Sequence, residues 1–282
     1  MIILLTIKSQ YPIYKNYCPC NNGSSAGYSP PFGMRYIPLD PNKKESMKYK
    51  YKEQKKLLGS STFKMAKSSK FKYLSEILHL APSNIGGVNI CASSSPICVK
   101  MCLNTSGRGQ MTSVQKSRLN KKYYFLSDRQ KFLKHLDREI KLSSERAKRK
   151  KLKYTVRLNG TSDLPFERYK LDNGLNLMEN NPNVQFIDYT KIKNRLLQKL
   201  PKNYSLTYSQ AENNLEDVKQ VLKTKYNIAT VFRKKLPKKW LGRKVINGDK
   251  HDLRHLDPKK VVVGLIAKGK AKKDFNGFVQ DV

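Results

Sequence analysis

Acidic residues are scarce in this chain. Its 282 residues include 57 lysines and arginines against 21 aspartates and glutamates, which gives a formal net charge of +36. A surplus of this size attracts polyanions, so nucleic acid is the partner that the composition predicts. The 57 basic residues divide into 44 lysines and 13 arginines. An AT-rich genome would produce the same lysine bias without any binding role, so charge alone leaves both interpretations open.

Long apolar runs are also absent. Hydrophobic residues make up 38 % of the chain, and no stretch reaches the roughly 18 consecutive apolar residues of a membrane-spanning helix. The opening Met-Ile-Ile-Leu-Leu-Thr-Ile is too short, and lacks the basic start, for a secretory signal peptide. The odd number of cysteines, five, argues against a disulfide framework. Together these features predict a protein of the reducing cytoplasm with no membrane partner.

The common nucleotide-binding and hydrolase motifs are missing as well, which leaves a cysteine cluster as the clearest chemical signal. Cys91, Cys98 and Cys102 follow the spacing Cys-x6-Cys-x3-Cys. Three thiolates leave one coordination position of a metal or cluster open, whereas a closed structural zinc site needs four ligands. His79 could supply a fourth. An iron–sulfur cluster and zinc both fit this pattern, and so do three inert, buried cysteines.

The composition divides the chain near residue 70. We expect residues 1–70 to form a basic, disordered N-terminal arm and residues 71–282 to form one α/β domain that begins with the cysteine-rich loop. The spacing of Leu74, Ile77 and Leu78 predicts a short helix. A capping box at Ser127–Gln130 predicts the start of a longer amphipathic helix.

Short apolar runs after residue 150 predict parallel strands, because helical or turn-rich segments separate them. The fold that we expect is an open or partial (β/α) barrel of about five to six parallel strands, preceded by a helical, basic N-terminal part. The predicted strands are Tyr154–Leu158, Val184–Tyr189, Tyr204–Tyr208, Ile228–Phe232 and Val261–Ile266.

Polar residues follow each predicted strand, and parallel strands bring such residues to one edge of the sheet. If they are instead ordinary loop residues, they should scatter over both ends. Acid/base or substrate-orienting roles are predicted for Asp163, Asp188, Lys191 and Glu212. Binding of phosphate or another part of the substrate is predicted for Arg108, Arg157, Asn159, Thr161, Ser162, Arg233, Lys268 and Lys270.

Several motifs over about residues 71–279 also match together. They are Leu80–Pro82, Gly87–Cys91, Ser95–Cys98, Cys102–Gly109, Arg157–Asp163, Asp188–Lys191 and Gly264–Ala271. In these segments the chain resembles a bacteriophage family named after mycobacteriophage gene product 88. The resemblance implies a phage or prophage origin, and hence the cytoplasm of the infected host cell, without assigning an activity.

That family in turn resembles, distantly, phage proteins with radical-SAM-type cysteine loops. The resemblance implies S-adenosylmethionine as a further cofactor, because three thiolates with an open fourth iron suit it. The usual spacing of such loops is Cys-x3-Cys-x2-Cys, from which this chain departs.

Two functions follow as expectations. The first is a phage enzyme acting on nucleic acid or a nucleotide-derived substrate, with a three-cysteine iron–sulfur or zinc site at the mouth of the barrel. The alternative is a non-catalytic nucleic-acid-binding protein with a structural zinc site. Iron content and visible absorption distinguish the two.

Overall fold

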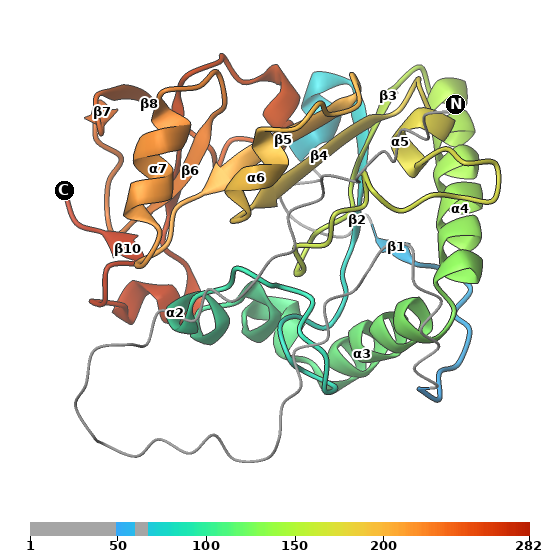
Figure 1. Cartoon of the computed structure of the whole chain (residues 1–282). Helices are drawn as coiled ribbons and strands as arrows, with labels where there is room; N and C mark the ends of the chain where they lie inside the picture. The colour runs from blue at the N-terminus through green and yellow to red at the C-terminus, as the bar shows by residue number, and fades with distance from the viewer. Residues whose placement is uncertain (1–48, 60–66) are drawn as a thin grey trace, which may run out of the picture. The chain divides into compact units, whose positions relative to one another are not determined.

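A mostly parallel β-sheet lies at the centre of the computed structural model, which describes residues 49–59 and 67–282 (Figure 1). Its strands are β1 (Leu58–Gly59), β2 (Tyr73–Leu78), β3 (Lys153–Arg157), β4 (Gln185–Thr190), β5 (Tyr204–Ser209), β6 (Ile228–Phe232), β7 (Lys239–Trp240), β8 (Arg243–Asn247), β9 (Val262–Ile266) and β10 (Val279–Gln280).

The strand order is β1-β2-β3-β4-β5-β6-β9-β8-β7, and β10 pairs with β6. All neighbours from β2 to β8 in this order are parallel, while β1 and β7 are short antiparallel strands at the two edges. The expected α/β class with parallel strands is therefore confirmed. The sheet is not closed, so it is an open sheet and no complete barrel forms.

All five predicted strands are present as β3, β4, β5, β6 and β9, with ends shifted by two residues at most. These segments are rich in β-branched and aromatic residues, and both of their faces are covered. Parallel strands that are buried on both sides give such apolar runs, which makes them visible in a sequence.

The helix predicted near Leu74 is wrong, because Tyr73–Leu78 forms strand β2. β2 pairs in parallel with β3 over five residues, from Tyr73 opposite Lys153 to Ile77 opposite Arg157. Four apolar positions in so short a segment fit both the helical period of about 3.6 residues and the strand period of two. Pairing with β3 determines that the segment forms a strand.

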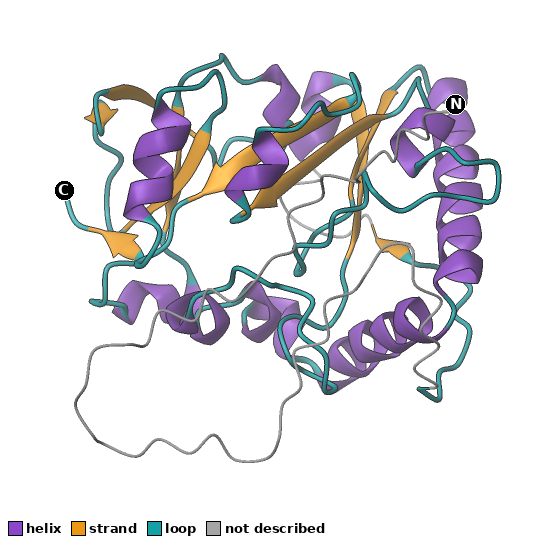
Figure 2. Ribbon diagram, viewed as in Figure 1, coloured by secondary structure: helices purple, strands orange, loops and turns teal. Residues whose placement is uncertain are grey.

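Six α-helices occur in the described residues, and Figure 2 shows α6 and α7 lying across one face of the sheet. No helix among these residues is both long and apolar enough to cross a membrane. The helices are α2 (Pro96–Lys100), α3 (Thr112–Ser127), α4 (Arg129–Arg149), α5 (Leu177–Asn180), α6 (Lys193–Leu196) and α7 (Leu215–Leu222).

The main hydrophobic core lies between the sheet and these helices. Phe132 and Leu136 of α4 pack there with Val156 of β3 and Phe186 of β4, and all four side chains are fully buried. The amphipathic face predicted for α4 is therefore confirmed. Its N-cap is Asp128, which accepts from the backbone N–H of Lys131 at 3.0 Å, one residue after the predicted cap.

Helices α3 and α4 do not precede the sheet, as the expectation of a helical N-terminal part required. They follow β2 and form the crossover to β3, together with three short 3₁₀ or α segments in the cysteine-rich region. Those segments are α2, η2 (Leu103–Thr105) and η3 (Gly107–Gln110). The first parallel strand went unrecognised, so the crossover was mistaken for a separate N-terminal part.

The opposite face of the sheet is covered by the loop between β8 and β9, which contains η4 (Arg254–Leu256). Asp252 of this loop pairs with Arg157 at 3.2 Å and accepts a hydrogen bond from Tyr189 at 3.1 Å. Tyr73 of β2 lies within hydrogen-bond distance of His255, at 3.1 Å. Polar contacts therefore join this loop to the sheet, next to the fully buried side chain of Leu253.

Most of the predicted N-terminal arm, residues 1–48 and 60–66, lies outside the described residues. Residues 49–59, however, are packed on the domain. Leu57 is fully buried, its backbone N–H donates to Glu139 of α4 at 2.8 Å, and Leu58 pairs with Leu78 in the sheet. The predicted boundary at residue 70 is therefore too late, because a single apolar pair in a lysine-rich segment was too weak a signal. The two remaining 3₁₀ helices are η1 (Ser69–Phe71) and η5 (Gly269–Lys273).

Candidate functional site

We call the edge at which β2, β3, β4, β5, β6 and β9 end the carboxyl edge of the sheet. The cysteine loop (residues 79–111) leaves β2 at this edge. Hydrogen bonds join it to the loops after other strands. The backbone N–H of Asp163 donates to the carbonyl of Ile90 at 3.0 Å, and Ser95 Oγ donates to Glu212 at 2.7 Å. The structure therefore brings these separated segments together at one edge.

Helix α2 carries the second cysteine and begins at a well-defined cap. Ser95 is the N-cap, and its Oγ accepts from the backbone N–H of Cys98 at 3.1 Å. Pro96 occupies the first helical position, where a missing N–H costs nothing. Glu212 accepts from Ser95 Oγ and from the backbone N–H of Ile97 at 3.1 Å. The predicted acid/base residue Glu212 thus anchors α2, and its chemical role stays a prediction.

The three thiols are close enough to influence one another's ionisation. Burial raises the pKa of Cys91 to about 12, and Cys102 and Cys98 each raise it further. Burial also raises the pKa of Cys102, with Cys98 adding to the effect. Cys91 Sγ accepts from the backbone N–H of Ser83 at 3.3 Å and donates to the carbonyl of Thr161 at 3.6 Å. Without a bound cation the thiols of Cys91 and Cys102 are therefore protonated at neutral pH. We call Cys91, Cys98 and Cys102 the cysteine trio.

Cations lie next to the cysteine trio, and one of them is fully buried. Lys122 of α3 is fully buried, and its ammonium donates to the carbonyls of Ser83 at 2.9 Å and Ile85 at 2.5 Å. Burial lowers the pKa of Lys122 to about 8, while Cys91 raises it. Arg118 donates to the amide oxygen of Asn104 at 2.6 Å and lowers the pKa of Cys102.

Two further lysines have different electrostatic neighbours. Lys121 donates to the carbonyl of Leu57 at 2.7 Å; burial lowers its pKa to about 8, and the nearby carboxylate of Glu139 opposes this shift. Lys191 donates to Ser209 Oγ at 3.0 Å and lowers the pKa of Cys102. Within residues 49–59 and 67–282, no carboxylate lies within ion-pair distance of Lys122, Arg118 or Lys191. Partly buried positive charge with neutral partners favours an anion, or thiolates, in its midst.

The end of β3 packs closely against the end of β2. Thr161 Oγ1 donates to the carbonyl of Leu80 at 2.6 Å and lies 3.4 Å from Nδ1 of His79. A Cβ at Gly160 would lie 2.5 Å from the same ring nitrogen and 2.6 Å from the carbonyl of Leu78, so only glycine fits. Burial lowers the pKa of His79 to about 3, which keeps its ring neutral and able to act as a ligand.

Asp163 is part of a buried ion-pair group. Arg195 of α6 is 1 % exposed and pairs with Asp163 at 2.6 Å and with Glu167 at 2.8 Å. The second oxygen of Asp163 accepts from the backbone N–H of Lys191 at 2.8 Å and from Thr190 Oγ1 at 3.2 Å. Asp163 therefore fixes the loop after β4, and a direct chemical role for it stays a prediction.

Asp188 lies beside this group, on the helix-covered face of β4. It accepts from Asn159 through the backbone N–H at 2.7 Å and the side-chain amide at 3.1 Å, and from Tyr204 at 2.9 Å. Burial raises the pKa of Asp188 to about 6, against the opposing effects of Arg157 and the hydrogen bonds. Ser162 Oγ donates to Asn159 at 2.9 Å. Within the predicted Asn-Gly-Thr-Ser-Asp segment, Asn159 therefore binds Asp188 directly and Ser162 supports Asn159.

The predicted cationic residues divide into two groups. Arg157 points to the opposite face of the sheet, where it pairs with Asp252 and lies over the ring of Tyr189 at 4.6 Å. The other four are at or near the surface. Lys268 pairs with Asp249 at 2.7 Å, and Arg233 pairs with Asp281. The exposed ones among them are Arg108, Lys268 and Lys270.

Sequence reasoning missed Arg195, Lys122 and Arg118. Arg195 and Lys122 are fully buried, although arginine and lysine belong mostly to surfaces. In a chain with 57 basic residues nothing in composition or spacing singled them out. A signal existed only for Arg195, which lies four residues after the predicted Asp188–Lys191 segment and within the next helix, α6.

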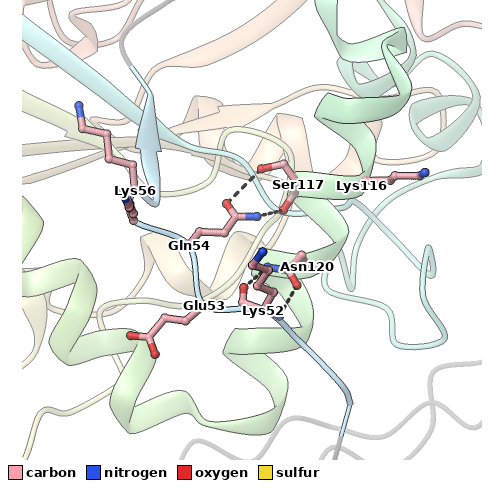
Figure 3. A pocket seen from close by; sticks show the side chains of 8 residues that line it. Lys52, Glu53, Gln54, Lys56, Lys116, Ser117 and Asn120 are labelled. Carbon is pink, nitrogen blue, oxygen red and sulfur yellow. Dashed lines mark hydrogen bonds between the residues drawn. The ribbon is translucent and has the colours of Figure 1, made fainter.

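A cleft between residues 52–56 and α3 is separate from the predicted site (Figure 3). Gln54 and Ser117 exchange hydrogen bonds across it at 3.1 and 3.2 Å, and the backbone of Lys52 bonds Asn120. None of the predicted site residues lines this cleft. These bonds fasten residues 52–56 to α3 in the folded domain.

Whether the trio fits a metal depends on donor type and position. In the part of the chain that the structure describes, no group of three or more His, Cys, Asp and Glu side chains is arranged so that it could hold a metal ion. The donor set itself fits, since three unpaired thiols and a neutral histidine lie at one edge among cations. To share one ion, the thiols would have to move closer together.

Comparison with known proteins agrees with the predicted resemblance. No curated protein and no solved structure matches the chain. The family model described as "Gene product 88" matches residues 42–281, which includes the packed segment 49–59, the cysteine loop and every strand of the sheet. The chain therefore belongs to the gene product 88 family of phage proteins.

Proposed function

We propose that this protein is a phage enzyme that acts on nucleic acid or a nucleotide-derived substrate and uses a metal or iron–sulfur centre held by Cys91, Cys98 and Cys102. One observation carries the proposal. Three mutually interacting thiols lie at the carboxyl edge of a parallel sheet, beside three cations, Lys122, Arg118 and Lys191, that have only neutral hydrogen-bond partners. Active sites of parallel α/β folds lie at this edge.

The charge around the trio supports the proposal. Three thiolates around a divalent ion, or around a doubly charged cubane cluster, carry a net charge of about −1. Lys122 and Arg118 would then face negative charge in place of neutral thiols. Binding of such a group would release the thiol protons and would lower the cost of burying these cations without counter-charges.

The three cysteines would hold the group. His79, whose ring is neutral, contacts Thr161, as Cys91 also does, and would be a candidate for a fourth ligand. With three protein ligands the bound group would supply an open coordination position, for Lewis-acid chemistry with zinc or for S-adenosylmethionine on a cluster. In this proposal Glu212 positions α2, and Arg195 and Asp163 hold the loop that carries Lys191. The open sheet would act as a partial barrel.

The residues at the carboxyl edge support an anionic substrate. Lys191 projects from the end of β4 toward Ser209, and its ammonium lies 5.8 Å from the ring of Phe278. Burial raises the pKa of Asp188 to about 6, which brings this carboxyl of the predicted site close to neutral pH. Lysines with neutral partners bind phosphate as compact positive charges.

The test is purification of the full chain without oxygen, followed by iron, zinc and acid-labile sulfide analysis and a visible absorption spectrum. We expect stoichiometric metal in the wild type and its loss in Cys98→Ala. Ser93→Ala, an exposed residue of the same loop, is the control and should retain the metal. A wild type that holds neither iron nor zinc would refute the proposed centre.

The same analysis separates the two candidate functions. Iron with sulfide and a visible band indicates a reactive cluster. One equivalent of zinc without iron or sulfide, lost together with folding in Cys98→Ala, favours the structural-zinc, non-catalytic alternative, which the net charge of +36 also suits.

A further inference from the structure

An exposed aromatic ring lies in the segment that follows β9, at the carboxyl edge of the sheet. Phe275 is 78 % exposed, and the guanidinium carbon of Arg233 lies 4.0 Å from its ring centroid. Arg233 follows β6, and the segment Lys268–Phe275 follows β9, the strand paired with β6. We call Arg233 together with Lys268–Phe275 the basic tip.

Hydrogen bonds fix the basic tip. Arg233 donates to the carbonyls of Lys272 at 3.0 Å and Asp274 at 2.6 Å, and it pairs with Asp281. The buried carboxylate of Asp274 accepts from the backbone N–H of Val279 at 2.9 Å, which ties the tip to β10. The ring of Phe275 is therefore held in place without being buried, so it loses little conformational freedom when it stacks on a ligand.

Positive charge surrounds this ring. Five lysines at or next to the basic tip are exposed, and among the described residues none has a carboxylate within ion-pair distance. They are Lys234, Lys235, Lys270, Lys272 and Lys273. A fixed, exposed ring among unpaired lysines is the combination that binds a nucleic-acid strand, because bases stack on the ring while phosphates pair with the ammonium groups.

The basic tip lies against the cysteine loop. A Cβ at Gly269, whose φ is +56°, would lie 2.8 Å from Ser106 Oγ. Met101, the neighbour of Cys102, packs against the small apolar cluster that contains Ala271 and Val279. Figure 1 shows the same proximity, with the red segment before β10 lying beside α2. A strand held at the tip would thus run beside the cysteine trio.

We infer that the basic tip is a docking site for single-stranded nucleic acid, with one base stacked on Phe275 and the backbone phosphates on the surrounding lysines. An unpaired base has a free face for the ring, whereas a duplex keeps its bases stacked on one another. The role of the tip as the substrate-binding part of the enzyme rests on the proposed function. Its affinity for a single strand does not.

Fluorescence anisotropy of the full chain tests this inference with a labelled 20-nucleotide oligothymidylate and a duplex of the same length. We expect Phe275→Ala to weaken single-strand binding about tenfold, the usual loss for one stacked base. Leu142→Ala is the control, since Leu142 is 62 % exposed on α4 and should leave binding unchanged. Replacing Lys272 and Lys273 with Gln should lower the slope of log affinity against log salt by about 1.4.

Equal affinity of Phe275→Ala and the wild type, or tighter wild-type binding to the duplex than to the single strand, would overturn the inference. The effect of Phe275→Ala is measured again in the Cys98→Ala background. If Phe275→Ala still weakens binding about tenfold there, and the wild type proves to hold no metal, the docking site stands and the proposed centre fails. If the metal is present and Phe275→Ala has no effect, the reverse holds.

Discussion

Two groups of buried charges lie at the carboxyl edge, and they are partnered in opposite ways. Around Arg195, one guanidinium is shared by the carboxylates of Asp163 and Glu167 and by the hydroxyl of Tyr204. Around the cysteine trio, Lys122 and its neighbours donate only to carbonyl, amide or hydroxyl oxygens. The first group has its counter-charges in place, whereas the second has cations beside protonated thiols.

The comparison teaches which group is built for stability and which for binding. A paired group fixes loops and is strongly destabilised when one member is removed, because the remaining charge is buried alone. Removing a cation that has only neutral partners changes the free energy of unfolding of the metal-free protein little. Such a cation stabilises the protein once a negatively charged group is bound beside it. The difference predicts three effects on the free energy of unfolding, from large to small.

The largest effect is expected for Arg195→Met. This substitution leaves the carboxylates of Asp163 and Glu167 buried beside each other, so we expect the free energy of unfolding to fall by about 3–5 kcal/mol. Urea denaturation at neutral pH measures it. Lys219→Met is the control, because Lys219 and Glu216 form an exposed pair whose loss should cost less than about 1 kcal/mol. Equal losses in the two variants would contradict the structural role of Arg195.

Asp188 should give a pH-dependent effect of intermediate size. Burial raises its pKa in the folded protein to about 6, above the value of about 3.9 for an unfolded aspartate. Between these values the folded state binds more protons, so its stability falls as pH rises through the window, by about 3 kcal/mol in all, and stays level above it. Asp188→Asn should remove this slope.

Urea denaturation of the wild type and Asp188→Asn at several pH values between about 4 and 7 checks the slope. Burial also raises the pKa of Asp257 to about 6, which adds a slope of the same sign to both proteins. The difference between the two proteins therefore isolates Asp188. Identical slopes would show that the three hydrogen bonds to Asp188 and its charged neighbours fully offset the effect of its burial.

Much of the sheet could be predicted because its strands are buried on both faces. The apolar runs that became β3, β4, β5, β6 and β9 needed only a period and a length to be recognised. β2 failed because its apolar spacing also fits a helix and its partner β3 lies about 75 residues further on. β1, β7 and β10 have two residues each, too short for any pattern.

The candidate site was predictable in outline, and its contacts were not. The cysteine spacing and the Asn159–Asp163 segment mark the carboxyl edge, since polar residues after parallel strands converge there. Glu212 caps α2 and Arg195 holds Asp163 through long-range contacts between separate loops. No local pattern encodes such contacts. The trio's metal, its chemistry and its substrate stay predictions.

The smallest change in stability is expected for Lys122→Met in the metal-free protein. The substitution stabilises the protein by removing a buried cation. It destabilises the protein by leaving the carbonyl of Ile85 without its donor, while the carbonyl of Ser83 still accepts from the backbone N–H of Ile90 at 3.2 Å. The two effects are of the same order, so we expect a net change below about 1 kcal/mol. The same substitution should weaken metal binding much more than it changes stability. Lys122 favours the thiolate of Cys91, and loss of such a neighbour typically weakens a site by about tenfold or more.

Competition with a chelator, compared with urea denaturation of the metal-free form, measures the two responses of Lys122→Met. Lys116→Met, an exposed position on the same helix, is the control and should change neither. A Lys122 variant that unfolds as easily as Arg195→Met, or that keeps its metal as tightly as the wild type, would erase the distinction between the two groups. Lys122 would then be a structural cation, held by Ser83 and Ile85 for packing and without influence on the thiols.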